Sequence, residues 1–585
     1  MAAKAGDQID GAIRQASVDS GRSMSSAGKG AGSDTGDNEL YKLNQVFYRA
    51  IPSLSTVAER NLQRTQFQLH QYTNLQQQTL TCILNTGENF INPLQSFLVM
   101  QLGIPLTAMG ANQKNWDIHA WLSAGGVASI IDEVWLTSAS GTEICREQNK
   151  GLQITHYLLN TLTPEYIRRN ALQEGICAPN LSDAYSGRGY CRAALGAAGY
   201  RGPVMDRAGA YVSGGADATA AGALNVIIPT IQNDQGLVDI TYCTTNSTGG
   251  ERLAGAAPIF AIPMNHILGC FDPYLQCLMP GALLAGAQLN IRIKNLIEPL
   301  QITGSGIQYN AAADTDASRL LYARNLANTA VINQIYIQFD CYKMNDNVVR
   351  KINQISAGSN GLTMMFDTFD WTSTNATGTQ VEAQVSQARS RIKASWCVVR
   401  DQDSVSNPFV PSLLSEAGIR RTVGPAKYDD QITCTAYPPT VANYQGILGS
   451  LYFPQQTISN YLEMYENQLY IFGKALRDDT DIACVSIQDF AGALGSENYN
   501  GGDIQSSVSN INWTSPYGAA IYGLTAERSS LLQMTGLTIA NARLLRHRFT
   551  FTTTTISGEP RIIDVFTQFT RQAKIFLGGR VVMRE

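Results

Sequence analysis

Along most of the chain, apolar and polar residues alternate with a period of two, which is the pattern of β-strands that bury one face. The clearest alternating runs lie at residues 78–84, 288–294, 333–342, 392–398 and 549–552. We therefore expect sheets with one buried and one solvated side. Residues 97–100, Phe-Leu-Val-Met, are apolar at every position and predict a strand buried on both faces.

Beyond the N-terminal region, three segments favour helices. Thr163 is a good N-cap residue, and Pro164 follows it at the first helical position. A second helix is predicted because apolar residues recur at helical spacing, namely Ile458, Leu462, Tyr465, Leu469 and Phe472. A third helix is predicted near Asn345, after a strand that ends at Tyr342, and we expect it to act as a hinge between two halves.

Long segments show neither pattern. Residues 1–38 are rich in Gly, Ser, Ala and Asp and cannot bury enough apolar surface to offset their ordering entropy, so we expect a mobile arm. Residues 40–47 have helical spacing, which Pro52 ends. Residues 174–256 form a long insertion that is dense in Gly and Ala. Loops of this length usually carry function or pack against partners.

These patterns predict the fold class. Many strands, few helices and long loops are typical of an antiparallel β-sandwich with elaborated ends. A chain of 585 residues is too long for one ordinary core, and two sandwiches fit its length.

Composition narrows the class of function. Charged residues make up 15% of the chain, against about 25% in an average soluble domain, and we interpret this deficit as surface that partners cover. The formal net charge of -4 gives the chain no electrostatic reason to condense nucleic acid. The 11 cysteines include no CxxC pair and are expected to be reduced core thiols. Neither a signal peptide nor a membrane-spanning run is recognised, so we expect a soluble chain made inside a cell.

No catalytic motif is complete. Residues 28–29 lack the rest of a phosphate-binding loop, and residues 187–189 lack the third glycine of a dinucleotide fingerprint. Asp132 and Glu133 are neighbours in a predicted strand, so their side chains point to opposite faces and cannot flank one glycosidic bond. The acids at 478–481 lack the glycine and the distal glutamate of a calcium loop.

The histidines are isolated and show no zinc-binding spacing: they are His70, His119, His156, His266 and His547. Folding could bring any of them to a serine, but no G-x-S-x-G elbow is present. We therefore predict no catalytic residues, no metal site and no cofactor, and a protein that is not an enzyme.

The C-terminal stretch is locally basic, with cations interleaved among phenylalanines at Arg543, Arg546, Arg548, Arg561, Arg571, Lys574, Arg580 and Arg584. These side chains could face nucleic acid or anionic neighbours. The favoured interpretation is that they pair with carboxylates such as Asp564 and cover sheet edges.

Several blocks of the chain resemble one family. Residues 257–296 and 329–352, separated by a long loop, resemble the latter half of the first jelly roll in major capsid proteins of polinton-like viruses and virophages. The shared order is a strand, a Pro-flanked apolar turn, a strongly alternating strand, and a last strand that runs into a short helix. Residues 522–585 resemble the final strands of the second jelly roll, and residues 91–106 resemble an early strand of the first.

This resemblance implies a mainly β protein with two tandem antiparallel jelly-roll β-sandwiches, a double jelly roll. The implied domains are an N-terminal arm and lead-in at 1–60, a first jelly roll at 61–344, a linking helix at 345–360 and a second jelly roll at 361–585. It also implies a major capsid protein that trimerises into pseudo-hexameric capsomers. These would form an icosahedral shell around a double-stranded DNA genome.

The implied partners are other copies of the chain in a homotrimer, neighbouring capsomers, penton proteins, and minor or cement capsid proteins. Contact with packaged DNA would be indirect, and contact with a membrane is left open. The implied location is the virion capsid, assembled inside the host cell. Residues 193–224 match nothing in the family, and we place them at a tower or a subunit contact.

Two other classes of function stay open. One is a viral spike or fibre built from sandwiches. The other is a carbohydrate-active sandwich enzyme, which would need a pair of inward carboxylates or an aromatic platform.

Overall fold

The computed structural model describes residues 57–106, 119–176, 240–244, 255–303, 325–401, 441–472, 521–525, 544–551 and 561–584, with short gaps inside several ranges. By compactness the chain divides into residues 1–56 and residues 57–585, and every described residue belongs to the second unit. The predicted arm therefore lies outside the described residues, apart from its last four positions, which open the first strand. The Gly/Ala-rich insertion at 193–224 also lies outside them.

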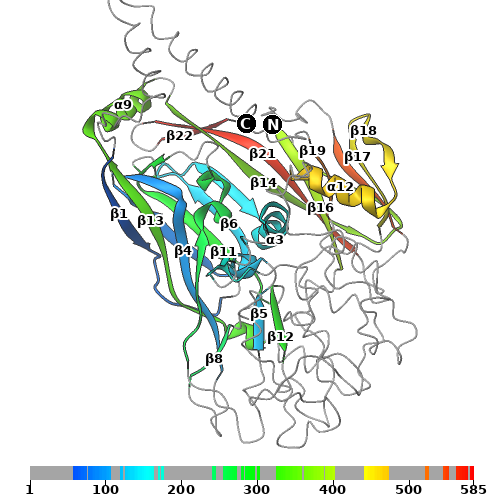
Figure 1. The fold of residues 1–585 in the computed structure, drawn as a ribbon, viewed down its shortest axis with the longest axis horizontal. Helices are drawn as coiled ribbons and strands as arrows, with labels where there is room; N and C mark the ends of the chain where they lie inside the picture. The colour runs from blue at the N-terminus through cyan, green and yellow to red at the C-terminus, as the bar shows by residue number, and fades with distance from the viewer. Residues whose placement is uncertain are drawn as a thin grey trace, which may run out of the picture. The chain divides into compact units, whose positions relative to one another are not determined.

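Strands from residues 57–344 form one sandwich (Figure 1). Its first sheet has the order β1 (Val57–Gln66), β13 (Val331–Met344), β4 (Phe90–Leu106) and β10 (Met279–Pro280), and β9 (Ile259–Pro263) also pairs with β4. Its second sheet has the order β3 (Thr79–Leu84), β11 (Ala287–Ile293), β6 (Ile131–Thr137) and β7 (Glu143–Gln148). Short strands add β2 (Tyr72–Thr73) and β8 (Thr241–Cys243) to the first sheet, and a separate ribbon pairs β5 (His119–Leu122) with β12 (Leu300–Thr303).

Strands from residues 362–584 form the other sandwich. Its first sheet has the order β14 (Leu362–Ala376), β21 (Arg561–Ile575), β16 (Ile392–Asp401) and β19 (Tyr522–Thr525), and β22 (Val581–Arg584) pairs with β21. Its second sheet has the order β15 (Gln380–Gln384), β20 (Leu545–Phe551), β17 (Val441–Leu448) and β18 (Leu451–Ile458).

The strand order is the same in both sandwiches. Each sandwich has eight main strands, which we number along the chain. In the first sandwich, β9 and β10 together count as strand 6. In both sandwiches, one sheet then has the order 1-8-3-6 and the other has the order 2-7-4-5. All of these neighbours are antiparallel. This is the order of a jelly roll, in which two Greek keys close into a double-sheet sandwich. The chain is a double jelly roll, and the predicted fold class is confirmed.

The alternating runs form the expected strands, with one correction in β4. Leu98 and Met100 are fully buried, but Phe97 and Val99, which alternate with them, are only half-buried. The prediction of a strand buried on both faces is therefore wrong here. The reason is that only one side of this sheet contacts the core of the sandwich.

A second correction concerns β11, whose polar face was expected to be solvated. Asn290 and Lys294 are instead buried. They are tolerated because each has a hydrogen-bonding partner: Lys294 Nζ donates to Asn149 Oδ1 at 2.8 Å, and Thr81 Oγ1 donates to Asn290 Oδ1 at 2.9 Å. Period two therefore located the strand but did not show which face is covered.

The helices predicted at Asn345 and Thr163 are confirmed where they are described. α9 (Asp346–Ala357) is capped by Asn345, whose Oδ1 accepts from the Asn347 backbone N–H at 3.4 Å. Thr163 Oγ1 accepts from the backbone N–H of Tyr166 at 3.2 Å, and Tyr166 is helical. Both starts follow from side-chain oxygens that satisfy N–H groups in the first turn.

The helix predicted over 458–472 is shorter, and a different face is buried. Residue 458 still belongs to β18, so the helix cannot begin there. α12 (Tyr461–Ile471) begins after Asn460, which caps it. Its buried face is Met464, Gln468 and Ile471, whereas Leu462 is 58% exposed. Gln468 displaces apolar residues from the core because its amide bridges Asn160 Oδ1 at 2.6 Å and the Ile521 backbone N–H at 3.0 Å.

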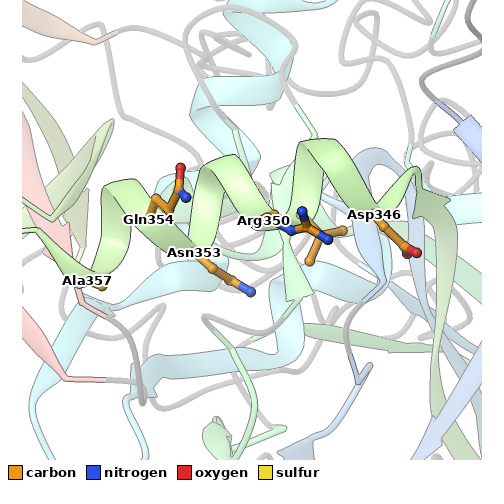
Figure 2. A pocket seen from close by; sticks show the side chains of 6 residues that line it. Asp346, Arg350, Asn353, Gln354 and Ala357 are labelled. Atoms are coloured by element: carbon orange, nitrogen blue, oxygen red, sulfur yellow. The ribbon is translucent and has the colours of Figure 1, made fainter.

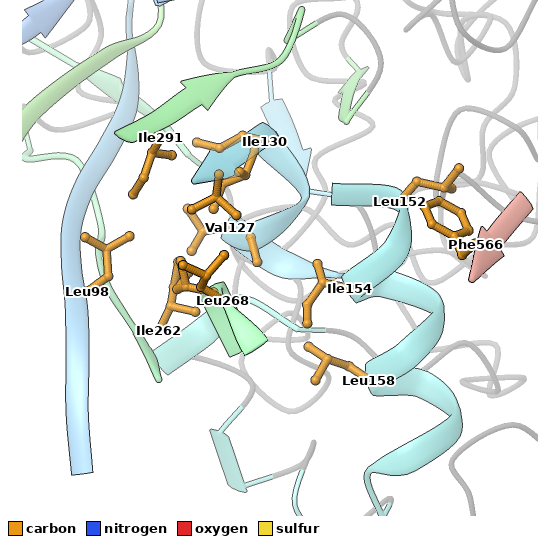
Figure 3. Close-up of a cluster of buried hydrophobic side chains, with 14 of the residues drawn as sticks. Leu98, Val127, Ile130, Leu152, Ile154, Leu158, Ile262, Leu268, Ile291 and Phe566 are labelled. Atoms are coloured by element: carbon orange, nitrogen blue, oxygen red, sulfur yellow. The ribbon is translucent and has the colours of Figure 1, made fainter. Parts of the chain in front are cut away.

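A long helix, α3 (Lys150–Thr161), was not predicted from the sequence. It lies between strands of the two sandwiches (Figure 1). Figure 3 shows Leu152 beside Phe566 of β21, while Ile154 and Leu158 point toward the core of the first sandwich. All four side chains belong to one continuous cluster of buried apolar residues. The two sandwiches therefore share a core.

Aromatic contacts extend this shared core from α3. The rings of His156 and Trp396 lie 6.3 Å apart, and Tyr157 meets Phe369 edge-on at 5.6 Å. At its start, α3 lies against the 3-10 helix η2 (Gly126–Ile130) so closely that a Cβ on Gly151 would be 2.1 Å from the Ser129 carbonyl oxygen. Glycine is thus required where α3 begins.

The sandwiches also meet directly, where β14 packs against β7 and the 3-10 helix η3 (Gly269–Phe271), which follows α7 (Met264–Ile267). Cys145 Sγ and Thr368 Oγ1 are 3.2 Å apart, and Arg571 donates to the Ile144 carbonyl at 3.2 Å. A Cβ on Gly269 would lie 1.9 Å from the Asp367 carbonyl oxygen. This contact leaves no room for any side chain at position 269.

We expect Gly269→Ala to destabilise the junction, because the added methyl would force β14 away from η3; overpacking of this kind costs about 1–3 kcal/mol. The measurement is the denaturant midpoint, with Gly255→Ala as the control because a Cβ there meets nothing within 4 Å. Equal midpoints for the two variants would contradict the close contact.

Candidate assembly surfaces

Folding brings one histidine to a serine, inside the core of the second sandwich. His547 Nε2 is 2.9 Å from Ser395 Oγ, and His547 Nδ1 is 2.9 Å from the Tyr444 hydroxyl. All three side chains are fully buried, so no substrate can reach the serine. The partner that orients the ring is a phenol rather than a carboxylate, and burial lowers the pKa of His547 to about 3. The arrangement therefore stabilises the core and has no access for catalysis.

The other histidines do not converge. His70 is exposed, His156 is buried against the second sandwich, and His266 Nδ1 lies 3.0 Å from Glu174 Oε2. His119 belongs to β5, and nothing described places it near another candidate residue. Within the described ranges, no group of three or more His, Cys, Asp or Glu side chains is arranged to hold a metal ion.

The adjacent acids of β6 lie on opposite faces, as their spacing predicts. Glu133 is buried and accepts from Arg146 at 2.6 Å, whereas Asp132 is partly exposed and pairs with Arg292 at 2.7 Å. Arg292 also contacts Glu133 at 3.0 Å, so both acids are neutralised by arginines and share one of them. The remaining motif candidates, residues 28–29, 187–189 and 478–481, lie outside the described residues.

Two of the C-terminal arginines pair with a carboxylate, which is Glu382 rather than Asp564. Arg546 and Arg548 donate to the two oxygens of Glu382 at 2.8 and 2.7 Å, and their hydrogen bonds hold the pKa of Glu382 below its usual value. Arg561 is buried with its guanidinium 4.1 Å from the centre of the Phe551 ring. These cations are used within the sandwich.

The described cysteines are core thiols, as predicted. Six of them are free and buried: Cys82, Cys145, Cys243, Cys270, Cys341 and Cys397. Burial raises the pKa of Cys82 to about 12 and that of Cys341 to about 11, so these thiols stay protonated near neutral pH.

Among the described helices, none is both long enough and apolar enough to cross a membrane.

Apolar side chains are exposed at one corner of the second sandwich. Strand β18 is exposed over seven consecutive residues, on both faces, and pairs only with β17 among the described strands. We call its apolar part the β18 surface: Leu451, Tyr452 and Phe453, with Leu544, which precedes β20 and whose carbonyl accepts from the Gly449 N–H in the turn before β18. Leu451 is 52% exposed. Pro454 within this apolar run was the available signal for an edge strand, and we missed it.

An equivalent exposed edge occurs on the first sandwich. β1 pairs only with β13 in the main strand order, and from residue 59 onward none of its residues is buried. Leu62 is 63% exposed, and the guanidinium of Arg64 lies 4.8 Å from the centre of the Tyr336 ring. We call this the β1 edge. It is strand 1 of its sandwich, whereas β18 is strand 5 of the other.

A third open surface lies along α9. A groove of about 450 Å³ is lined by one side of the helix, including Asp346, Arg350, Asn353, Gln354 and Ala357, as Figure 2 shows. The apolar residues of the helix are not fully covered either, since Ile355 is 53% exposed. α9 therefore offers both a polar and an apolar side to partners.

Comparisons with known proteins find similarity in structure only. No family model matches the sequence, and no curated protein sequence matches it. The alignment with the Faustovirus major capsid protein covers 98% of each chain at 10% identity and a TM-score of 0.46. For the mavirus major capsid protein, it covers 95% of this chain and 96% of that chain at 11% identity and a TM-score of 0.44.

A quasi-atomic model of the PBCV-1 virus capsid aligns over 92% of this chain and 99% of that chain, at 10% identity and a TM-score of 0.48. The identities and scores are low in all three cases. The assignment of the fold therefore depends on the strand order within this chain.

His547 generates a prediction about pH. Its folded-state pKa is about 3 and its ordinary value is 6.5, so below pH 6.5 the unfolded chain takes up a proton that the folded chain does not. Stability from this residue is present above pH 6.5 and falls as pH decreases, by about 1.4 kcal/mol per pH unit.

The measurement is the free energy of unfolding at pH 7.0 and 5.5 for the natural chain and for His547→Gln. We expect the variant to be less stable at pH 7.0 but to lose less stability on acidification. An identical loss in both proteins would show that His547 does not titrate in this range.

Proposed function

We propose that this chain is the major capsid protein of an icosahedral virus with a double-stranded DNA genome. The observation that carries the proposal is the occurrence of two jelly rolls with identical strand order in one chain, packed around a shared core. Two sandwiches packed on one core are suited to forming a wall. The one serine–histidine contact described, Ser395–His547, is buried and has no access to a substrate.

The way the two sandwiches meet supports a homotrimer. Within the chain, strand 5 of the first sandwich, β7, packs against strand 1 of the second, β14. The two equivalent strands that do not take part in this contact are β18 and β1. β18 is strand 5 of the second sandwich, and β1 is strand 1 of the first. Both are exposed. If β18 of one copy packs against β1 of the next, the same kind of contact occurs six times around a ring of three chains.

Such a ring is a pseudo-hexameric capsomer. Its interfaces would cover the β18 surface and account for part of the deficit in charged residues, which are 15% of the chain. In this proposal residues 1–60 are an arm, 61–344 and 361–585 are the two jelly rolls, and 345–360 are the link between them.

Further partners follow from the surfaces that such a ring leaves open. We assign the groove along α9 to neighbouring capsomers, penton proteins or minor capsid proteins, because its polar and apolar sides are both accessible. Direct condensation of DNA by the chain is not part of the proposal, since its net charge is -4.

We expect the purified chain to have a native mass three times that of the monomer, and negative-stain images to show hexagonal outlines with threefold symmetry. The measurements are mass photometry and electron microscopy. Elongated particles would indicate a fibre instead, and a stable monomer would contradict the capsomer.

The proposed contact between copies can be tested at either side. Leu62→Glu on the β1 edge and Tyr452→Glu on the β18 surface should each weaken the trimer at least tenfold, because each places a charge in a desolvated contact. Gln456→Glu is the matched control, since it adds the same charge farther along the exposed strand β18.

The readout is the trimer fraction as a function of concentration, together with circular dichroism to establish that each variant folds. Dissociation by Gln456→Glu as well would indicate a general effect of charge on β18. Unchanged trimers in both Leu62→Glu and Tyr452→Glu would exclude the proposed pairing of edges.

A further inference from the structure

A partly enclosed cavity of about 320 Å³ lies where the two sandwiches meet. The first sandwich lines it with Lys150, Gln153 and Tyr157 of α3 and with residues of the α7–η3 segment, and the second lines it with residues of β14 and β21. Its volume is at the small end of the range for sites that bind small molecules. The cavity is therefore built jointly by both halves of the chain.

Most charges around this cavity are compensated. Lys150 Nζ lies 2.5 Å from Glu147 Oε2, and Glu147 Oε1 also accepts from the Gly269 backbone N–H at 2.9 Å. Asp367 is paired with Lys393 at 2.8 Å and accepts from Thr570 at 3.0 Å. The negative charges of Glu147 and Asp367 are therefore neutralised by lysines.

Asp272 is different. Among the described residues it has no ion-pair partner, and it lies on the exposed side of the cavity. The pKa of Asp272 is raised, mainly because the carboxyl is partly desolvated and also because the negative charge of Asp367 is near. The positive charges of His266 and Lys393 lower this pKa, but by less. Among the described residues that line the cavity, Asp272 is therefore the carboxylate without an ion-pair partner.

Two amide side chains in the cavity have buried atoms without a hydrogen-bond partner. Gln153 is fully buried, and neither its Oε1 nor its Nε2 has a hydrogen-bond partner. Asn265 Oδ1 is buried and also unpartnered. A buried amide without partners costs about 1–3 kcal/mol, so such groups are normally satisfied by a protein group, an ordered water molecule or an ion.

We propose that this cavity binds a small organic cation of the alkyl amine class, with its ammonium group held by the oxygens of Asp272, Asn265 and Gln153. An ammonium group donates three hydrogen bonds and carries the charge that Asp272 lacks. Its methylene chain packs against Tyr157 and Phe369, which form an edge-on aromatic pair in the wall.

A hard metal ion fits less well. Calcium takes six to eight oxygen ligands, usually including several carboxylates. In the cavity the carboxylates of Glu147 and Asp367 are already engaged by lysines, which leaves Asp272 alone. The aromatic and aliphatic part of the lining also suits an organic ligand rather than a hydrated ion.

The test is the thermal midpoint of the full-length protein in increasing putrescine, compared with 1,4-butanediol, calcium chloride, and potassium chloride at matched ionic strength. We expect putrescine to raise the midpoint in a saturable manner and the neutral diol to have no effect. Asp272→Asn should weaken the apparent affinity for putrescine at least tenfold.

Two further variants make the test specific. Gln153→Met removes the unpartnered amide without changing size greatly and should also abolish the response, while the fold is retained or stabilised. Asp346→Asn removes an exposed carboxylate on α9 and should leave the response unchanged. The proposal is overturned if calcium or potassium chloride reproduces the effect of putrescine, or if Asp272→Asn responds like the natural chain. Neither result would depend on whether the chain forms trimers.

Discussion

The burial of α3 on two sides is the interaction on which the rest of the described structure depends. Ile154 and Leu158 fill the first sandwich while Leu152 reaches Phe566 of the second, so one helix completes two cores. Each such side chain contributes about 1.5–3 kcal/mol on burial. Separation of the sandwiches would expose these residues together, and the pair therefore behaves as one folding unit rather than as two domains on a linker.

Polar contacts fix the geometry of this shared core. Gln468 of α12 bridges Asn160 of α3 to the backbone at Ile521, which ties α3 to the second sandwich at the end opposite Leu152. The buried Glu147–Lys150 pair anchors the start of α3 to η3 through the Gly269 backbone N–H. Apolar packing alone would tolerate sliding of one sandwich past the other, but a shift would leave these groups buried without partners.

Much of the fold could be predicted from the sequence because strand alternation reports burial of one face, and capping residues such as Asn345 mark where helices begin. α3 escaped prediction for physical reasons. Asn149 before it has a positive φ of 47° and makes no capping bond, and apolar residues occur on both sides of the helix because both are buried. The Ser395–His547 contact joins residues from different strands, and the arginine partner Glu382 lies on β15, so neither pairing is encoded in local spacing.

The two kinds of sandwich contact also differ in chemistry, and their energetics explain why. The β7–β14 contact forms within one chain, where the link through α9 keeps the sandwiches close, so hydrogen bonds such as Cys145–Thr368 and a close backbone approach suffice. In the proposed trimer, an equivalent contact between copies must also overcome the loss of translational and rotational freedom, about 4–15 kcal/mol. More apolar area is then needed. The exposed row Leu451, Tyr452 and Phe453 on β18 supplies that area at the strand position where it is required.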